Sequence, residues 1–277
     1  MFFDIYEFLS KLYHVTPEKA LQQYLQSLDN DTTRTNYAII LKEFCQHFER
    51  LIDIDAKAVL AFKATLIDKS PQTISSRMSA IRSFLMYCWE HNWIPVDPSI
   101  PIKQDNVQRY QNSKNITIEQ FKEILAHINV TSLAGLRDYL LLRLLFIYGD
   151  INKILDLKIN SPLPEVINED RKKYVSMLAE TVPLGDLKAG YLFFGLEKIN
   201  PSQKLSLSGI RKIFKKYSAL AGMPENFLDF TAIKRLRAKQ IYEQTNSVEA
   251  VRLFCGHGHS TQTKTFLKTL FPGQKYF

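Results

Sequence analysis

Two prolines close together divide the chain into two helical parts. In the segment WIPVDP (93–98) they deny a helical backbone to the residues that precede them. The residues that follow, to about Asn115, are polar and show no helical or strand period, so we interpret them as a linker. A chain of 277 residues is long enough for two domains. We therefore expect one domain over residues 1–108 and a second over 109–277.

Hydrophobic periodicity predicts four helices before this break. The first opens with a capping threonine and a proline and covers about 16–28, and an apolar stripe at 3.6-residue spacing marks the second at 37–48. The third covers about 55–67, and the fourth begins after Ser70. The polar face of the fourth helix combines small polar side chains with Arg77, which suits a phosphate backbone but is equally typical of a solvated face. Four such helices predict one compact bundle.

The second part is expected to be mainly α-helical with a small β-sheet. The dense apolar run LLLRLLFIY, inside a helix predicted at 132–148, indicates a buried central helix. Residues 156–182 contain short β-compatible runs around Val175 among turn-forming residues, and these predict a small sheet or hairpin. Further helices are predicted at 117–128, 206–221, 231–244, 247–255 and 260–270.

The positive charge is concentrated in the second part. The chain carries a net charge of +8, of which residues 1–110 contribute −1 and residues 111–277 contribute +9. Residues 211–220 and 231–240 each hold four positive charges and no acidic residue. Such runs indicate either a phosphate-rich partner or a pair of solvated helix faces.

Composition excludes several classes of protein. A hydrophobic fraction of 45% with only 10 Gly and 11 Pro excludes a disordered or collagen-like chain. Three widely spaced cysteines form neither a disulfide framework nor a CxxC pair, and His257 and His259 have no further ligands nearby, so we expect no metal and no cofactor. Without a run of 18 uncharged apolar residues or a secretion signal, the chain is expected to be cytoplasmic and not to bind membranes.

A specific order of segments runs through the second part. The stretch YLFFGLEKINPSQKLSLSGIRKIFKKYSALAGM (191–223) is followed by a basic helix and then by VRLFCGH (251–257). This order resembles the catalytic domain of tyrosine recombinases. The first part, which ends in IPVDP (94–98), is similar to the core-binding domain of the same family, which includes phage integrases and Xer-type recombinases. The resemblance implies a helical (SAM-like) core-binding bundle and an α/β catalytic-type domain that together embrace duplex DNA.

The resemblance also implies a chemistry. Members of the family cut DNA by attack of a tyrosine hydroxyl on a phosphodiester. The reaction needs that nucleophile, two arginines that hold the non-bridging oxygens of the transition state, and histidine or lysine groups that transfer protons. Arginine suits the clamp because its planar fork forms two parallel charge-assisted hydrogen bonds.

Four of these positions are replaced when the chain is aligned on its intact Gly-His element (256–257). Ile151 stands in place of the first arginine, Thr231 in place of a histidine, and Lys234 in place of the second arginine. Phe266, nine residues after the histidine, stands in place of the nucleophile, and a phenyl ring cannot attack phosphorus. Losing one preorganised donor typically costs about 3–4 kcal/mol of transition-state stabilisation. The resemblance therefore predicts a catalytically inactive protein that still binds DNA.

The expected DNA contacts are cationic side chains and the retained histidine. They are Arg77, Lys172, Lys173, Lys212, Lys234, Arg237 and His257. Either Lys172 or Lys173 would replace the lysine that the family carries on a hairpin, because the loop is shortened here. His257 would donate to a bound phosphate, or it would instead cap a helix turn beside its glycine neighbours.

Two other interpretations stay open. Tyr276, 19 residues after His257, would be a displaced nucleophile in an active recombinase. Alternatively it would anchor the C-terminal segment on a second copy of the chain or on an active recombinase paralogue. A helical module that binds an acidic protein partner would also explain the basic helices, and it predicts no binding to duplex DNA.

Overall fold

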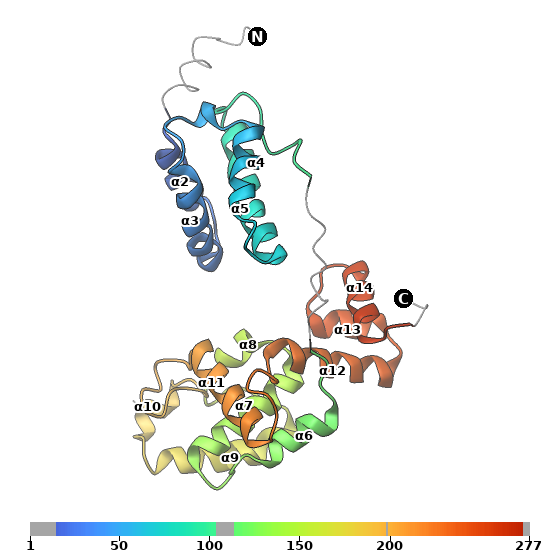
Figure 1. Cartoon of the computed structure of the whole chain (residues 1–277). Helices are drawn as coiled ribbons and strands as arrows, with labels where there is room; N and C mark the ends of the chain where they lie inside the picture. The colour runs from blue at the N-terminus through green and yellow to red at the C-terminus, as the bar shows by residue number, and fades with distance from the viewer. Residues whose placement is uncertain (1–14, 104–113, 198, 274–277) are drawn as a thin grey trace. The chain divides into compact units, whose positions relative to one another are not determined.

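The computed structural model describes residues 15–103, 114–197 and 199–273 (Figure 1). The chain separates into two compact units, Met1–Arg109 and Tyr110–Phe277. The described part of each unit has a hydrophobic core of its own. The predicted boundary between residues 108 and 109 lies outside the described residues, and the domain names that the resemblance implies stay predictions.

Four α-helices form the described part of the first unit, as periodicity predicts. They are α2 (Pro17–Gln26), α3 (Asp31–Cys45), α4 (Ala56–Thr65) and α5 (Pro71–Glu90), with a 3-10 turn at Leu51–Asp53. Before each α-helix, a side-chain oxygen of Thr16, Asn30, Asp55 or Ser70 accepts a hydrogen bond from a backbone N–H of the first turn. These caps satisfy donors that a helix start leaves open, which explains why each helix begins where it does.

The core of the first unit joins α3 to α5. Leu41 and Phe44 on α3, and Ile81 and Phe84 on α5, have no solvent-exposed surface. Burying an aliphatic or aromatic side chain of this size stabilises the fold by about 1.5–3 kcal/mol. The Tyr24 hydroxyl on α2 donates to Ser83 Oγ on α5 at 2.7 Å, which ties a third helix to this pair.

Nine α-helices form the described part of the second unit. They are α6 (Ile118–Ala126), α7 (Leu133–Tyr148), α8 (Ile151–Leu155), α9 (Glu165–Ala179), α10 (Leu184–Lys188), α11 (Leu207–Leu220), α12 (Phe230–Thr245), α13 (Val248–Cys255) and α14 (Ser260–Leu270). Three consecutive leucines of α7, at 140–142, are completely buried. Since consecutive residues point in different directions around a helix, α7 is covered on several sides and is the predicted central helix (Figure 1).

The predicted small β-sheet is wrong, because no sheet forms among the described residues. Only two isolated antiparallel bridges occur there, Lys158↔Tyr191 and Phe194↔Lys204. The outer edge at Lys158 is closed by a turn, in which the Lys158 N–H donates to Ser161 Oγ at 2.8 Å and the Ser161 N–H donates to the Lys158 carbonyl at 2.9 Å. No further strand can pair with groups that are already bonded.

The run around Val175, predicted to be β, lies within α9. Ile167, Tyr174 and Leu178 are the buried residues of this helix, and their spacing of seven and four places them on one helical face. The preceding residues NEDRKK favour a helix more than a strand. Packing of α9 against α7 therefore outweighs a β-compatible run of a few residues.

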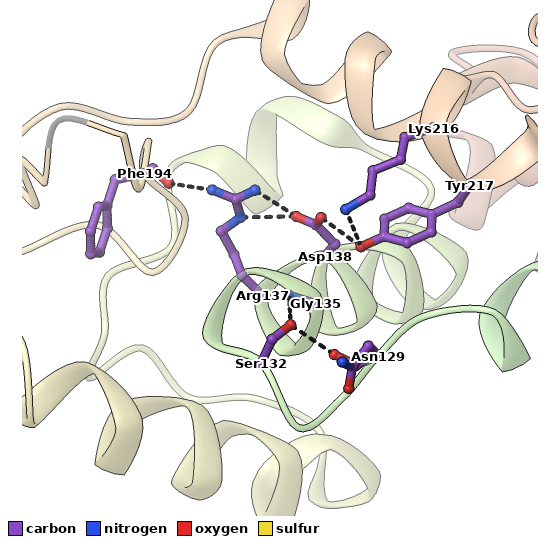
Figure 2. Close-up of polar contacts among 8 residues, drawn as sticks. All are labelled: Asn129, Ser132, Gly135, Arg137, Asp138, Phe194, Lys216 and Tyr217. Carbon is purple, nitrogen blue, oxygen red and sulfur yellow. Dashed lines mark hydrogen bonds and ion pairs between the residues drawn. The ribbon is translucent and has the colours of Figure 1, made fainter. Parts of the chain in front are cut away.

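A buried polar cluster fixes α11 against α7 (Figure 2). The Arg137 guanidinium donates to the Asp138 carboxylate at 2.7 and 2.9 Å and to the Phe194 carbonyl at 3.2 Å. The Tyr217 hydroxyl on α11 donates to the other carboxylate oxygen at 3.0 Å and accepts from Lys216 Nζ at 3.2 Å. Because Asp138 is 2% exposed, its charge needs these partners, and they hold the basic helix α11 in a fixed orientation.

Candidate functional site

A pocket of about 340 Å³ opens where α7, α8, α12, α13 and α14 meet. Its wall includes all five positions that the alignment selects, namely Ile151, Thr231, Lys234, His257 and Phe266. The remaining lining residues are Leu145, Gly149, Asp150, Phe230, Arg235 and Cys255. Side chains separated by more than 100 residues in the sequence therefore meet at one place.

A tight turn sets the direction of Ile151. Gly149 ends α7 in the left-handed conformation, with φ of 64°, and its N–H donates to the Leu145 carbonyl at 2.8 Å. The Asp150 carboxylate then caps α8 by accepting from the Asn152 N–H at 3.0 Å. Ile151 is the first residue of α8, and it packs against the core of the second unit. An apolar side chain thus lies at the pocket position where the resemblance implies an arginine.

Lys234 is the half-buried cation of the pocket. Its Nζ donates to the Cys255 carbonyl at 2.9 Å, which joins α12 to the end of α13. An ammonium group has three donors, so this bond leaves it able to bind an anion as a point charge. Thr231, one turn earlier on α12, is exposed at the pocket wall.

His257 and Phe266 lie against each other. The rings meet edge to face, with centroids 5.6 Å apart and planes at 85°. His257 Nδ1 lies 3.0 Å from Oγ1 of the buried Thr263, which holds the ring toward α14. Partial burial, and then the charge of Lys234, lower the pKa of His257 below its usual value of 6.5. The imidazole is therefore mostly neutral at pH 7.

Phe266 is part of the core rather than a group held out for reaction. It is 4% exposed and packs in a cluster with Val251, Leu267 and Leu270. The Arg235 guanidinium lies over its ring at 5.6 Å from the centroid. Among the described residues that line the pocket, none is a tyrosine.

Arg235 is the pocket residue that sequence reasoning missed. The charge run suggests a solvated side chain, yet Arg235 is 2% exposed. Its guanidinium donates to Asn115 Oδ1 at 2.8 and 3.0 Å, to Thr269 Oγ1 at 2.9 Å and to the Thr269 carbonyl at 3.1 Å. A signal is present in the sequence, because position 235 lies on the same helical face as the buried Ala232 and Leu236.

The predicted hairpin lysines do not reach the pocket. Lys172 and Lys173 are exposed on α9, so their assignment to a hairpin is wrong. Lys172 forms an ion pair with Glu169 at 2.8 Å. Neither lysine lines the pocket. The chain between the first bridge and α9 is too short for a two-stranded hairpin, which is the physical reason for the difference.

The other predicted DNA contacts are spread over both units. Arg77 on α5 forms an ion pair with Glu43 at 2.6 Å. Lys212 is exposed on α11. Arg237 is half-buried, with its guanidinium 5.3 Å from the ring centroid of Phe146. Tyr276 lies outside the described residues, so its proposed roles stay predictions.

The described residues contain no group of three or more His, Cys, Asp or Glu side chains arranged to hold a metal ion. In the same part of the chain, every helix is too short or too polar to cross a bilayer.

Comparison with solved structures defines the class of fold. The chain has the fold of the tyrosine recombinase and phage integrase family. The XerH site-specific recombinase bound to palindromic difH substrate, in a post-cleavage complex, matches with a TM-score of 0.68 and 17% identity over 95% of this chain and 84% of XerH. A lambda integrase dimer bound to a COC′ core site matches with a TM-score of 0.66 and 14% identity over 100% of this chain and 84% of the integrase.

Curated relatives carry the same family name. The tyrosine recombinase XerC of Chlamydia muridarum is 23% identical over 209 residues, which are 68% of this chain and 64% of that protein. The match thus spans just under two thirds of the relative's length. A tyrosine recombinase of Synechococcus elongatus is 33% identical over 90 residues, 32% of this chain. No family model matches the chain.

Proposed function

We propose that the chain binds duplex DNA without cutting it. The observation that carries the proposal is the position of Phe266, whose ring packs against His257 inside the pocket. The structural neighbours are described as recombinases bound to difH and to a core site, which supports DNA as the ligand class.

The remaining groups of the pocket suit binding more than catalysis. Lys234 supplies one positive charge, but it cannot form the two parallel hydrogen bonds of an arginine fork. Ile151 supplies no donor, and Thr231 supplies a hydroxyl that does not take up a proton near pH 7. Since each lost donor costs about 3–4 kcal/mol, the two replaced arginines alone lower the rate of cleavage by several orders of magnitude.

Charge supports a phosphate backbone as the partner. The net charge of +9 lies in residues 111–277. Two of its positive charges, Arg211 and Lys212, are exposed on α11. The cluster of Asp138 and Tyr217 holds that helix on the core, so the backbone that carries these cations is ordered before binding (Figure 2). Cationic side chains on one helix face suit contacts to a phosphate backbone.

Salt dependence tests the proposal. With roughly 6–10 phosphate contacts, affinity for a labelled duplex should fall about 10³–10⁵-fold between 50 and 200 mM salt. Lys212→Gln should reduce the slope by about one, while Lys122→Gln, which removes an exposed charge from α6, should leave it unchanged. A shallow slope, or binding to an acidic polypeptide but not to duplex DNA, would contradict the proposal.

Assembly on DNA is a second part of the proposal. Lambda integrase is described both as a dimer and as a tetramer bound to a Holliday junction. By analogy, we expect more than one copy of this chain, or one copy beside an active recombinase, on a DNA site. The mass of the complex, measured by light scattering on a duplex of fixed length, checks the stoichiometry, and a single copy at saturation would contradict assembly of this chain with itself.

A further inference from the structure

Arg235 connects three parts of the second unit that are distant in sequence. Its partner Asn115 lies 120 residues earlier, directly after the segment that joins the two units. Its partner Thr269 lies 34 residues later, in the last turn of α14. The guanidinium itself lines the pocket and lies over the ring of Phe266. One buried side chain therefore contacts the start of the unit, its last described helix and the pocket wall.

The connection continues into the pocket through α14. The Thr269 hydroxyl donates to the Phe266 carbonyl at 2.7 Å, so the residue that holds Arg235 is bonded to the residue that forms the wall. Phe266 contacts His257, which also lies 3.0 Å from Thr263 on the same helix. A change in the position of α14 would thus move both Phe266 and His257 in the pocket.

The hydrogen bonds at Arg235 favour a joint movement of α14 and Asn115 over an independent movement of either. Four hydrogen bonds hold a guanidinium that is 2% exposed, and bonds to a charged donor are stronger than neutral ones. Asn115 is exposed, but its Oδ1 accepts from two N–H groups of the buried guanidinium, and both bonds would be lost if Asn115 moved away alone. Because hydrogen bonds to a charged donor are worth about 1.5–3 kcal/mol, they favour the observed positions of α14 and Asn115 together.

We propose that Arg235 is a positioning residue that couples the pocket and α14 to Asn115, near the start of the second unit. The use of this coupling rests on the proposed function, since DNA bound in the pocket would then change the environment of Asn115, and a displaced Asn115 would change the pocket. The contacts themselves are independent of DNA.

Hydrogen–deuterium exchange on the full chain tests the coupling without DNA. Asn115→Ala removes the acceptor and should speed exchange in α14 by about fivefold, because the Asn115 side chain is hydrogen-bonded to Arg235, which is bonded in turn to Thr269 of α14. Thr269→Val removes one acceptor from α14 and should speed exchange at residues 114–118 by a similar factor. Asn115→Asp keeps the acceptor and adds a charge, so it should retain or increase protection in α14.

Control variants separate coupling from general loss of stability. Lys173→Gln removes one charge from the exposed side of α9, which does not line the pocket, and should leave both segments unchanged. The far-UV circular dichroism of each variant shows that it is folded. If Asn115→Ala speeds exchange only at residues 114–118, or if Asn115→Asp behaves like Asn115→Ala, the coupling does not exist.

A second arm with duplex DNA distinguishes this inference from the proposed function. Duplex binding should slow exchange in α14 and at 114–118 together in the natural sequence, and it should slow α14 alone in Asn115→Ala. Slowing at both segments in that variant would contradict transmission through Arg235. If no duplex is retained at all, the proposed function is wrong, while the DNA-free comparison still decides the coupling.

Discussion

At the scale of single residues, the side chains at the five aligned positions pack or bond within one pocket. Phe266 fills its place in the α14 cluster with a ring that has no hydroxyl. Ile151 packs on the core where an arginine would extend a charge. Lys234 retains a positive charge but directs it partly to the Cys255 carbonyl. Each of these side chains is held by contacts of the fold, which is consistent with the proposal that the chain binds DNA without cutting it.

The pH dependence of stability tests the environment of His257. Its pKa is lowered in the folded state, by burial first and by Lys234 second, so the unfolded chain binds more protons below pH 6.5. The contribution of His257 to the free energy of unfolding should therefore be complete above about pH 6.5. It should decrease as the pH falls below 6.5 toward the pKa of His257 in the folded chain. Urea midpoints measured from pH 5.5 to 7.5 check this, and His257→Gln should remove that part of the slope. An unchanged slope in His257→Gln would contradict it.

The three cysteines should be unreactive in the folded chain. Burial raises the pKa of Cys255 to about 11 and that of Cys45 to about 12, and it also raises the pKa of Cys88. Since the thiolate is the reactive form, a disulfide reagent at pH 8 should modify them slowly. All three should react quickly once guanidinium unfolds the chain. Rapid modification of the folded chain would show that these side chains are not buried.

At the scale of elements, the positions of the helices can be predicted from the sequence better than the contacts between them. Caps such as Thr16 and Ser70 satisfy backbone donors locally, so their helices can be predicted without knowing what they pack against. The case of α9 differs, because its buried residues are sparse and contact with α7 adds to a weak local preference for helix. The burial of Arg235 depends on Asn115 and Thr269, which no local pattern connects with it. The alignment selected five pocket positions, but only the tertiary fold shows that they share one wall.

Two glycines that end helices provide a matched pair of substitutions. Gly149 and Gly256 have φ of 64° and 70°, so alanine at either position costs about 1 kcal/mol of conformational energy. At Gly149 a Cβ would also lie 2.5 Å from Phe254 Cζ, whereas at Gly256 it would meet nothing within 4 Å. Gly149→Ala should therefore destabilise the second unit by about 1–3 kcal/mol more than Gly256→Ala.

Two optical signals make this comparison specific. Both tryptophans, Trp89 and Trp93, lie in the first unit, so their fluorescence reports on that unit. Urea unfolding followed by circular dichroism should shift in both glycine variants, while the tryptophan transition should stay in place. Equal losses of stability for the two variants would contradict the contact between Gly149 and Phe254.

At the scale of the whole molecule, two units with separate cores carry very different charge. Residues 1–110 are close to neutral and residues 111–277 carry +9, so long-range attraction of a polyanionic partner belongs to the second unit. The pocket lies within that unit, and Arg235 in its wall is bonded to Asn115. The proposed function therefore depends on the second unit for both its charge and its pocket.

A covalent trapping assay tests the absence of cleavage most directly. The purified chain is incubated with a nicked suicide duplex at a concentration where gel shift shows binding, and the products are separated under denaturing conditions. An active tyrosine recombinase on its own site serves as the positive control. The account predicts a shifted duplex and no protein–DNA adduct. An adduct formed by this chain, and lost on Tyr276→Phe, would show that a displaced tyrosine cuts DNA and would contradict it.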